Sequence, residues 1–369
     1  MKRQPKNIVI LGATGSIGGS AREVAKELPD HVRLIGLSAH SNKSELAAAA
    51  ADFPDAKTVV SCGDGGEERL IELATLPDAE MVLVAIVGTG GLRPALAAIE
   101  AGKDLAVASK EILVMAGEIV MAAAKRKGVR ILPVDSEHNA IHQCLDGRPP
   151  ESVRKVILTC SGGPFRTTAA ADLATVTPEQ ALRHPTWSMG KKISVDSATL
   201  FNKGLEMIEA RWLFDLPMPR VEAIIHPQSI IHSMVEFVDG SLLAQLSHSD
   251  MRFPIQYAFT WPDQVPNSLP ALDFSELAKL EFEAPRHEDF PALRLARKAG
   301  ESCGTLPAVL NAANEVAVDA FLAGRIRFPE IWQLVESAMD ASQPKAGPSL
   351  GEILAADTWA RSFVEAGIA

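Results

Sequence analysis

The sequence is poor in cysteine, in aromatic residues and in positive charge. Its four cysteines (Cys62, Cys144, Cys160 and Cys303) form no CxxC pair, which excludes a disulfide framework and a cysteine zinc site. The formal net charge of −10 argues against a surface that binds nucleic acids or anionic membranes. No apolar run approaches membrane-spanning length, and the N-terminal residues lack the pattern of a signal peptide. We therefore expect a cytoplasmic protein with reduced thiols, no nucleic-acid or membrane partner, and room for a local basic pocket that binds a phosphorylated small molecule.

The chain has 369 residues, 47% of them hydrophobic, and is long enough for two or three domains with cores of their own. Up to Val134, short apolar runs alternate with helical patterns, which predicts an α/β fold with a Rossmann-like, doubly wound parallel sheet. Strand patterns continue into an expected α+β domain, and a small helical domain follows from Phe290 onwards. The expected limits are 1–148 for the Rossmann-like domain, 149–260 for the α+β domain and 287–369 for the helical domain, with a proline-rich linker at 261–286.

A glycine-rich turn follows the first expected strand at 7–11. Gly12, Gly15 and Gly18 have the spacing GxxGxxG and lead into an expected helix at 20–28. In the order strand, glycine turn and helix, glycines let the backbone approach a pyrophosphate, and the helix N-terminus supplies free N–H groups. The turn therefore predicts a dinucleotide site, the alternative being a glycine turn with no ligand.

The end of the next expected strand, at 32–38, lacks an acidic residue. In NAD-binding folds an acid at this place holds the ribose 2′-hydroxyl. Residues 39–43 instead read Ala-His-Ser-Asn-Lys, and their polar and basic side chains suit a 2′-phosphate. The sequence therefore favours NADPH over NADH.

Two carboxylates follow the apolar run at 131–134. In an extended backbone Asp135 and Glu137 point to the same side, with Ser136 between them. Neighbouring carboxylates repel one another unless a cation or a proton lies between them, and oxygen ligands suit Mg²⁺ or Mn²⁺. The pair therefore predicts a divalent-metal site, with an exposed turn as the alternative. Lys110 also follows an expected strand, so it belongs to the same edge of the sheet.

Two segments past residue 148 combine small polar residues with charge. Ser161 precedes two glycines, in a turn suited to presenting a hydroxyl and backbone N–H groups to a phosphate. The segment 196–206 is expected to begin a helix on which Lys203 and Glu206, three residues apart, share a face. Glu206 is then a candidate third carboxylate for the metal, and Lys203 a candidate partner of a phosphate. A tight turn and a surface ion pair are the alternatives.

The segment 184–190 is rich in turn-forming residues but carries one tryptophan and one methionine, Trp187 and Met189. Such a segment does not suit a regular core element. It predicts a loop that folds over a ligand, as active-site lids do. A plain surface loop is the alternative.

Six segments closely resemble one family, the 1-deoxy-D-xylulose 5-phosphate reductoisomerases of non-mevalonate isoprenoid biosynthesis. They keep the family's order and read LGATGSIG, LPVDSEHNAI, SGGPFR, HPTWSMGKKISVDSATLFNKGLE, HPQSIIHSMVEF and GTLPAVLNAANE. The resemblance implies an NADPH domain at 1–148, a catalytic domain at 149–260 and a homodimer. It also implies isomerisation of 1-deoxy-D-xylulose 5-phosphate and its reduction by NADPH to 2-C-methyl-D-erythritol 4-phosphate. Mn²⁺ or Mg²⁺, with Co²⁺ as an alternative, would act as the Lewis acid.

The same resemblance implies roles for individual residues. The catalytic residues would be Lys110, Asp135, Glu137, His184 and Glu206, of which Asp135, Glu137 and Glu206 would hold the metal. The substrate and its phosphate would be bound by Ser136, Ser161, His184, Trp187, Ser197, Asn202 and Lys203. The cofactor would be contacted by Thr14, Gly15, Ser16, Ile17, Asn42, Ser109, Glu111, Gly190 and Met251.

The sequence departs from the family pattern at three places. Ser109 and Thr186 stand where the family often has asparagine, and His40 stands where it often has glycine. The departures at Ser109 and His40 bear on cofactor affinity and not on the chemistry.

Two other classes of protein remain as alternatives. A semialdehyde dehydrogenase shares the opening glycine pattern but needs a cysteine nucleophile with a histidine. A dinucleotide-sensing regulatory protein has no use for three carboxylates beside a phosphate pocket.

Overall fold

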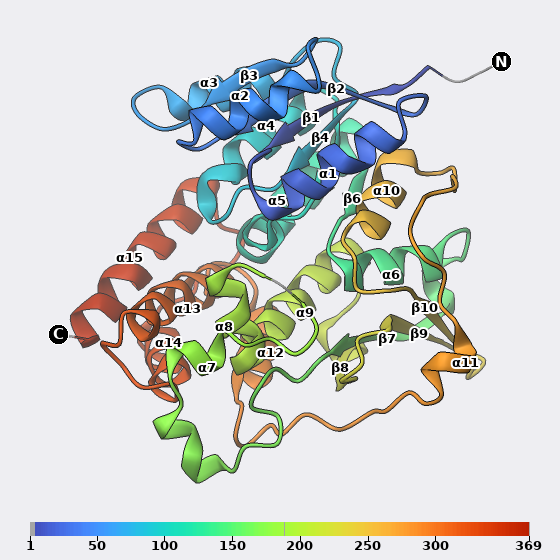
Figure 1. Cartoon of the computed structure of the whole chain (residues 1–369). Coiled ribbons are helices and arrows are strands. Elements are labelled where there is room, and N and C mark those ends of the chain that lie inside the picture. The colour runs from blue at the N-terminus through green and yellow to red at the C-terminus, as the bar shows by residue number, and fades with distance from the viewer. Residues whose placement is uncertain (1–3, 188, 369) are drawn as a thin grey trace. The chain divides into compact units, whose positions relative to one another are not determined.

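The computed structural model describes residues 4–187 and 189–368, so Ser188 of the expected loop and the chain ends lie outside the described residues. The chain divides into two compact units, each described by itself below. Unit 1 comprises Met1–Ile112, Glu118–His142 and Asp250–Ala271, and unit 2 comprises Leu113–Gly117, Gln143–Ser249 and Leu272–Ala369. Figure 1 traces the chain from its blue N-terminal to its red C-terminal part. The domain limits expected from the sequence stay predictions.

Unit 1 is built on a six-stranded parallel sheet in the order β3-β2-β1-β4-β5-β6. The connections reverse direction between β1 and β4, which is the place where doubly wound sheets bind their ligands. The predicted Rossmann-like sheet is therefore confirmed. Its strands are β1 (Lys6–Leu11), β2 (Val32–Ala39), β3 (Lys57–Val60), β4 (Met81–Val84), β5 (Asp104–Val107) and β6 (Ile131–Pro133).

Helices cover both faces of this sheet, which explains why its strands are continuously apolar. Ile8 and Ile10 of β1 point to one face and are fully buried in a core shared with α1 (Ser16–Glu27) and α10 (Arg252–Thr260). Val9 points to the other face, towards α3 (Gly66–Ala74). The remaining helices that begin in unit 1 are α2 (Lys43–Ala51), α4 (Leu92–Glu100), α5 (Lys110–Lys127) and α6 (Ser136–Leu145).

Unit 2 contains a four-stranded mixed sheet in the order β10-β9-β7-β8. β7 (Val153–Cys160) pairs in parallel with β8 (Val221–Ile225) and antiparallel with β9 (Ile231–Phe237). A turn at 239–240 joins β9 to β10 (Leu242–Leu246), as the sequence predicted. The expected α+β character of this part of the chain is confirmed.

The other regular elements of unit 2 are helices, and α13 is the most buried of the long ones described. It packs against α14 and α15 in the helical bundle that the sequence predicted (orange to red in Figure 1). No helix in the described ranges 4–187 and 189–368 has both the length and the apolar character needed to cross a membrane. The helices are α7 (Pro178–Ala181), α8 (Lys191–Thr199), α9 (Phe201–Leu213), α11 (Phe274–Leu277), α12 (Ala292–Ser302), α13 (Leu306–Leu322), α14 (Glu330–Ala341) and α15 (Leu350–Ile368).

Candidate active site

The glycine turn after β1, residues 12–18, forms a cradle of backbone that is too tight for a side chain at Gly12 or Gly18. Gly12 has a φ of +96°, and a Cβ there would lie 2.3 Å from the carbonyl oxygen of Ala85. A Cβ on Gly18 would lie 2.2 Å from the carbonyl oxygen of Gly12. α1 begins at Ser16 without a side-chain cap from the described residues, and Gly15 and Ser16 are exposed. An uncapped helix N-terminus of this kind suits a pyrophosphate. The predicted cofactor residues Thr14, Gly15, Ser16 and Ile17 all lie in this cradle.

Ser109 and Glu111 hold a second glycine turn, which follows β4. The hydroxyl of Ser109 donates to the carbonyl oxygen of Ile86 (2.6 Å), and the Glu111 carboxylate accepts the N–H of Gly88 (3.1 Å). Gly88 has a φ of +77°, and a Cβ on it would meet nothing within 4 Å, so this turn is open on one side. Both polar side chains are buried. Their hydrogen bonds therefore hold the backbone of this turn in place. A cofactor at the edge of the sheet would contact that backbone.

Two further predicted cofactor residues flank helices of unit 1. Asn42 caps α2, because its side-chain oxygen accepts the N–H of Glu45 (3.1 Å). Met251 precedes α10 and is partly buried against the core of unit 1. The hydrogen bonds from Arg252 lower the pKa of the Asp250 carboxyl below its usual value, so a pair of opposite charges flanks Met251.

The stretch predicted to bind metal is a strand-to-helix turn. β6 ends at Pro133 and α6 begins at Ser136, while the carbonyl oxygen of Asp135 accepts the N–H of Asn139 (2.9 Å). The predicted extended backbone through 135–137 is therefore wrong. Asp and Ser are favoured where a helix begins, and the partial positive charge of the helix N-terminus stabilises carboxylates there. We call residues 135–137 the carboxylate turn.

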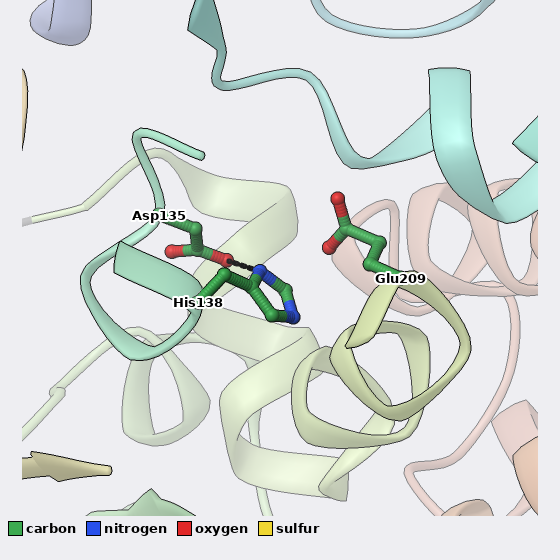
Figure 2. A group of neighbouring side chains, drawn as sticks. All are labelled: Asp135, His138 and Glu209. Atoms are coloured by element: carbon green, nitrogen blue, oxygen red, sulfur yellow. Dashed lines mark ion pairs between the residues drawn. The ribbon is translucent and has the colours of Figure 1, made fainter. Parts of the chain in front are cut away.

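Asp135 of the carboxylate turn gathers two basic side chains. Lys110 forms an ion pair with its carboxylate, and Nδ1 of His138 lies 3.8 Å from the same oxygen (Figure 2). The hydroxyl of Ser136 donates to the carboxylate of Glu137. The structure thus brings Lys110 to the carboxylate turn, as the sequence predicted. His138 was not predicted as a site residue; it is almost fully buried, and its only signal in the sequence is its spacing of three residues from Asp135.

In unit 2, Leu200 separates two helices where the sequence predicted the start of one. Leu200 has a φ of +66°, and it ends α8 and begins α9. The predicted start of a helix within 196–206 agrees with α9, which begins at Phe201, whereas α8, which begins at Lys191, was not predicted. The sequence of α8, KKISVDSAT, is rich in β-branched residues, serine and aspartate, which have low intrinsic helix propensity, and its helical state depends on packing.

The predicted common face of Lys203 and Glu206 on α9 is confirmed. Their side chains form an ion pair and are 2% and 0% exposed, so it is not a surface ion pair. The side-chain amide of Asn202 also donates to the Glu206 carboxylate (2.6 Å). One carboxylate and two phosphate-binding candidates therefore share a buried cluster. Glu209, one turn further along α9, is also buried and is drawn in Figure 2.

The turn after β7 lies against the end of α8. Gly163 has a φ of +68°, and a Cβ there would lie 2.8 Å from the carbonyl oxygen of Ser197. The hydroxyl of Ser161 accepts the N–H of Gly163 (3.1 Å) and lies 2.9 Å from Nε2 of His184. Three of the predicted phosphate and substrate residues, Ser161, Ser197 and His184, are therefore brought together within unit 2.

The contacts of His184 define where its proton lies. Its Nδ1 accepts the backbone N–H groups of Thr186 (3.2 Å) and Trp187 (2.9 Å), so in this arrangement Nε2 carries the hydrogen. Nε2 then donates to Ser161, whose oxygen also accepts from Gly163. The hydroxyl hydrogen of Ser161 is thus free to point at another acceptor, such as a phosphate oxygen. The described residues of 182–190 form no regular element, as predicted, and Gly190 immediately precedes α8.

The parallel sheet and its glycine cradle define unit 1 as a Rossmann-type dinucleotide-binding domain. Family models described as 1-deoxy-D-xylulose 5-phosphate reductoisomerase match residues 8–64 and 55–117, and the model of that enzyme's C-terminal domain matches 131–214. A model described as DXP reductoisomerase C-terminal domain matches 246–363. The chain belongs to the 1-deoxy-D-xylulose 5-phosphate reductoisomerase family.

Individual relatives match over nearly the whole chain. The 1-deoxy-D-xylulose 5-phosphate reductoisomerase of Symbiobacterium thermophilum is 52% identical, covering 96% of this chain and 97% of its own. A solved structure of the enzyme from Zymomonas mobilis in complex with NADPH is 44% identical, with a TM-score of 0.93 over 99% of each chain. A DOX-P reductoisomerase in complex with NADPH, fosmidomycin and magnesium is 39% identical, with a TM-score of 0.93 over 98% of each chain. The predicted family is confirmed, and the two alternative classes are set aside.

Proposed function

We propose that the chain converts 1-deoxy-D-xylulose 5-phosphate into 2-C-methyl-D-erythritol 4-phosphate in non-mevalonate isoprenoid biosynthesis, using NADPH and a divalent metal ion. Membership of the reductoisomerase family over the full length carries this proposal. Solved relatives contain NADPH and magnesium, and the glycine cradle and the carboxylate turn of this chain have the chemistry that these two groups require.

The cradle at residues 12–18 supports NADPH binding in unit 1, because no side chain fits at Gly12 or Gly18 and the uncapped N-terminus of α1 suits a pyrophosphate. When bound, NADPH supplies a hydride to the substrate. Ser109 and Glu111, which hold the turn at Gly88, would position that turn against the cofactor, and Met251 would lie near its nicotinamide. The proposed contacts are Thr14, Gly15, Ser16, Ile17, Asn42, Ser109, Glu111, Gly190 and Met251.

The metal would be held by Asp135, Glu137 and Glu206. Three carboxylates form a hard oxygen donor set, which suits Mg²⁺ or Mn²⁺, with Co²⁺ as an alternative. The bound ion supplies a Lewis acid for the carbonyl and hydroxyl oxygens of the substrate. Asp135 and Glu206 each form an ion pair with a lysine. A cation would compete for these carboxylates and leave Lys110 and Lys203 to bind the substrate.

The substrate phosphate would be bound in unit 2, where hydroxyl, amide and ammonium groups gather around the end of α8 and the start of α9. Ser161 contributes its hydroxyl hydrogen, and His184 orients Ser161 and the loop that carries Trp187. That loop would fold over the substrate and exclude water. The proposed contacts are Ser161, His184, Trp187, Ser197, Asn202 and Lys203, with Ser136 at the carboxylate turn.

The metal assignment is tested by Glu206→Gln, which keeps the size of the side chain and removes its charge. We expect Mn²⁺ affinity, measured by calorimetry, and kcat/KM both to fall by more than about tenfold, since even indirect supports of a metal site cost that much. Glu301→Gln, an exposed change in the same unit, serves as the control. Affinity and turnover at the wild-type level in Glu206→Gln would show that Glu206 does not hold the metal.

We further propose a cytoplasmic homodimer whose small-molecule partner is the phosphorylated substrate, with no nucleic acid or membrane partner. β10 is an edge strand of the unit 2 sheet. Leu242 and Leu243 on it are 47% and 36% exposed, and Val238 in the turn before it is 66% exposed. Exposed apolar edge strands pair with other chains, which makes this edge the proposed dimer contact. We also propose that the NADPH-binding domain ends at residue 148, the catalytic domain at residue 260 and the linker at residue 286.

A further inference from the structure

A buried hydrogen bond joins α13 of the helical bundle to α8. The side-chain amide of Asn314 on α13 donates to the carboxylate of Asp196 on α8 (2.7 Å), and the two residues are 0% and 1% exposed. The other carboxylate oxygen of Asp196 forms an ion pair with Lys192 of the same helix (2.6 Å). The buried carboxylate is therefore held by one partner on its own helix and by one on α13.

The amide of Asn314 is not explained by the stability of α13. A carboxylate only accepts hydrogen bonds, so the amide nitrogen of Asn314 faces Asp196. Its amide oxygen is then buried, and no atom within residues 4–187 and 189–368 forms a hydrogen bond with it. A buried oxygen without a partner lowers the free energy of unfolding. The contact with Asp196 is what an asparagine provides at this place and an apolar residue does not.

α8 has little that stabilises it on its own. It is nine residues long, and Gly190 before it supplies no side-chain cap. It begins with Lys191 and Lys192, although the positive end of the helix dipole disfavours cations there. A lysine that precedes an aspartate by four residues is also the weaker order for an ion pair on a helix. The position of α8 therefore depends on the elements packed against it, α13 among them (Figure 1).

α8 in turn places residues of the proposed substrate site. Ser197 follows Asp196 directly, and its carbonyl oxygen would lie 2.8 Å from a Cβ on Gly163, in the turn after β7. The first residue of α8 follows the end of the loop at 184–190. A shift of α8 would thus move Ser197 relative to the turn that carries Ser161. The turn after β7 and α13 hold the helix from two sides.

We propose that Asn314 is a positioning residue for the substrate phosphate, because its hydrogen bond to Asp196 fixes α8 where Ser197 reaches the phosphate. The inference rests on the proposed function, in which Ser197 binds the phosphate of the substrate. Asn314 itself does not touch the substrate. A phosphate is bound alike in the ground state and the transition state, so a displaced Ser197 raises KM and leaves kcat nearly unchanged.

The test is the steady-state kinetics of the full chain with 1-deoxy-D-xylulose 5-phosphate, NADPH and Mn²⁺. Asn314→Asp sets a second buried carboxylate against that of Asp196. Combining Asn314→Asp with Asp196→Asn exchanges the amide and the carboxylate and restores a hydrogen bond between the two helices. Asn311→Asp is the matched control. Asn311 lies three residues earlier on α13, is equally buried, and donates to the Glu315 carboxylate (3.0 Å) instead of to α8.

We expect Asn314→Asp to raise the KM for the substrate more than about tenfold and to keep kcat within about twofold of wild type, since small misplacements of binding groups are costly. The exchanged pair should bring KM back to within about threefold of wild type, as coupled residues do in a double-mutant cycle. Asn311→Asp should keep the wild-type KM. Partial unfolding would instead lower kcat, because fewer molecules are active, and would leave KM unchanged.

Leucine variants keep the test decisive if Asn314→Asp does not fold. Leucine is close to asparagine in size but has neither a donor nor a charge, and we expect a several-fold higher KM in Asn314→Leu and a wild-type KM in Asn311→Leu. A wild-type KM in a folded Asn314 variant, an equal rise in the matching Asn311 variant, or no recovery in the exchanged pair would overturn the inference alone. No turnover by the folded wild-type chain would overturn the proposed function, and the inference with it.

Discussion

At the scale of single residues, Gly163 shows how a missing side chain positions a functional one. A methyl group there would meet the carbonyl oxygen of Ser197 at 2.8 Å, on a backbone with a φ of +68°. We expect Gly163→Ala to displace the end of α8 from Ser161 and to raise the KM for the phosphorylated substrate more than about tenfold, since small misplacements of binding groups are costly. Steady-state kinetics measures this change.

Gly147→Ala is the matched control for Gly163→Ala. Gly147 has a φ of +71°, but a Cβ on it would meet nothing within 4 Å. In both variants an alanine takes up a left-handed backbone conformation, which lowers the free energy of unfolding by about 1 kcal/mol. Only in Gly163→Ala does the new methyl group also clash with a neighbouring atom. A KM that rises equally in the two variants would contradict the positioning role of Gly163.

The residue types in the sequence predicted the chemistry of the site better than they predicted which side chains contact one another. Asp135 and Glu137 were singled out because neighbouring carboxylates repel one another unless a cation or a proton lies between them, and Glu206 as a candidate third carboxylate for the same cation. The hydrogen bond between Ser161 and His184 joins residues 23 apart in the chain, and the contact between Asp196 and Asn314 joins residues 118 apart. Such contacts depend on the tertiary fold, so neither could be predicted from local pattern.

At the scale of elements, α15 begins with a pair of reciprocal hydrogen bonds. The Ser349 hydroxyl accepts the N–H of Glu352 (3.3 Å), and the Glu352 carboxylate accepts the N–H of Ser349 (2.9 Å). The backbone N–H of Ser349, the Lys345 ammonium and the Ser349 hydroxyl all donate to the Glu352 carboxylate, and these bonds lower its pKa to about 2. Because the pKa is lower in the folded than in the unfolded chain, the charged carboxylate stabilises the fold above its unfolded pKa, and this contribution is lost as the pH falls towards 2.

Glu352→Gln tests the direction of this pH dependence, because a glutamine side chain can still form the hydrogen bonds at the start of the helix but carries no charge. We expect the variant to unfold at lower urea concentration than wild type near pH 5, and the difference between the two midpoints to shrink as the pH is lowered towards about 3. Urea titrations followed by circular dichroism measure both midpoints. A difference that stays constant across this range would contradict the assigned role of the charge.

The elements of unit 1 were predicted more accurately than those around the site. Its strands are buried on both faces and give continuous apolar runs, so the six strands fall close to their expected positions. The carboxylate turn was predicted as strand because the apolar run 131–134 gave no sign of where the helix would begin. α8 was missed because its low helix propensity is overridden by packing. Functional polar residues weaken the local signals on which prediction depends.

At the scale of the whole molecule, the exposed edge of β10 predicts the mode of assembly. Leu243→Lys places a charge on this edge strand, which disfavours pairing with a second chain. We expect sedimentation velocity to show a dimer for wild type and a shift towards monomer for Leu243→Lys. Phe274→Lys, which changes a more exposed apolar residue on α11, should remain dimeric. A monomeric wild type, or equal effects of both variants, would contradict the proposed contact.

The central claim is that the chain is an NADPH- and metal-dependent reductoisomerase. The most direct test follows NADPH absorbance with purified protein and 1-deoxy-D-xylulose 5-phosphate, first with Mn²⁺ and then with excess EDTA. The account predicts loss of absorbance with the metal and none with the chelator, with 2-C-methyl-D-erythritol 4-phosphate as the product. Constant absorbance under both conditions, from a folded chain that binds NADPH, would contradict it.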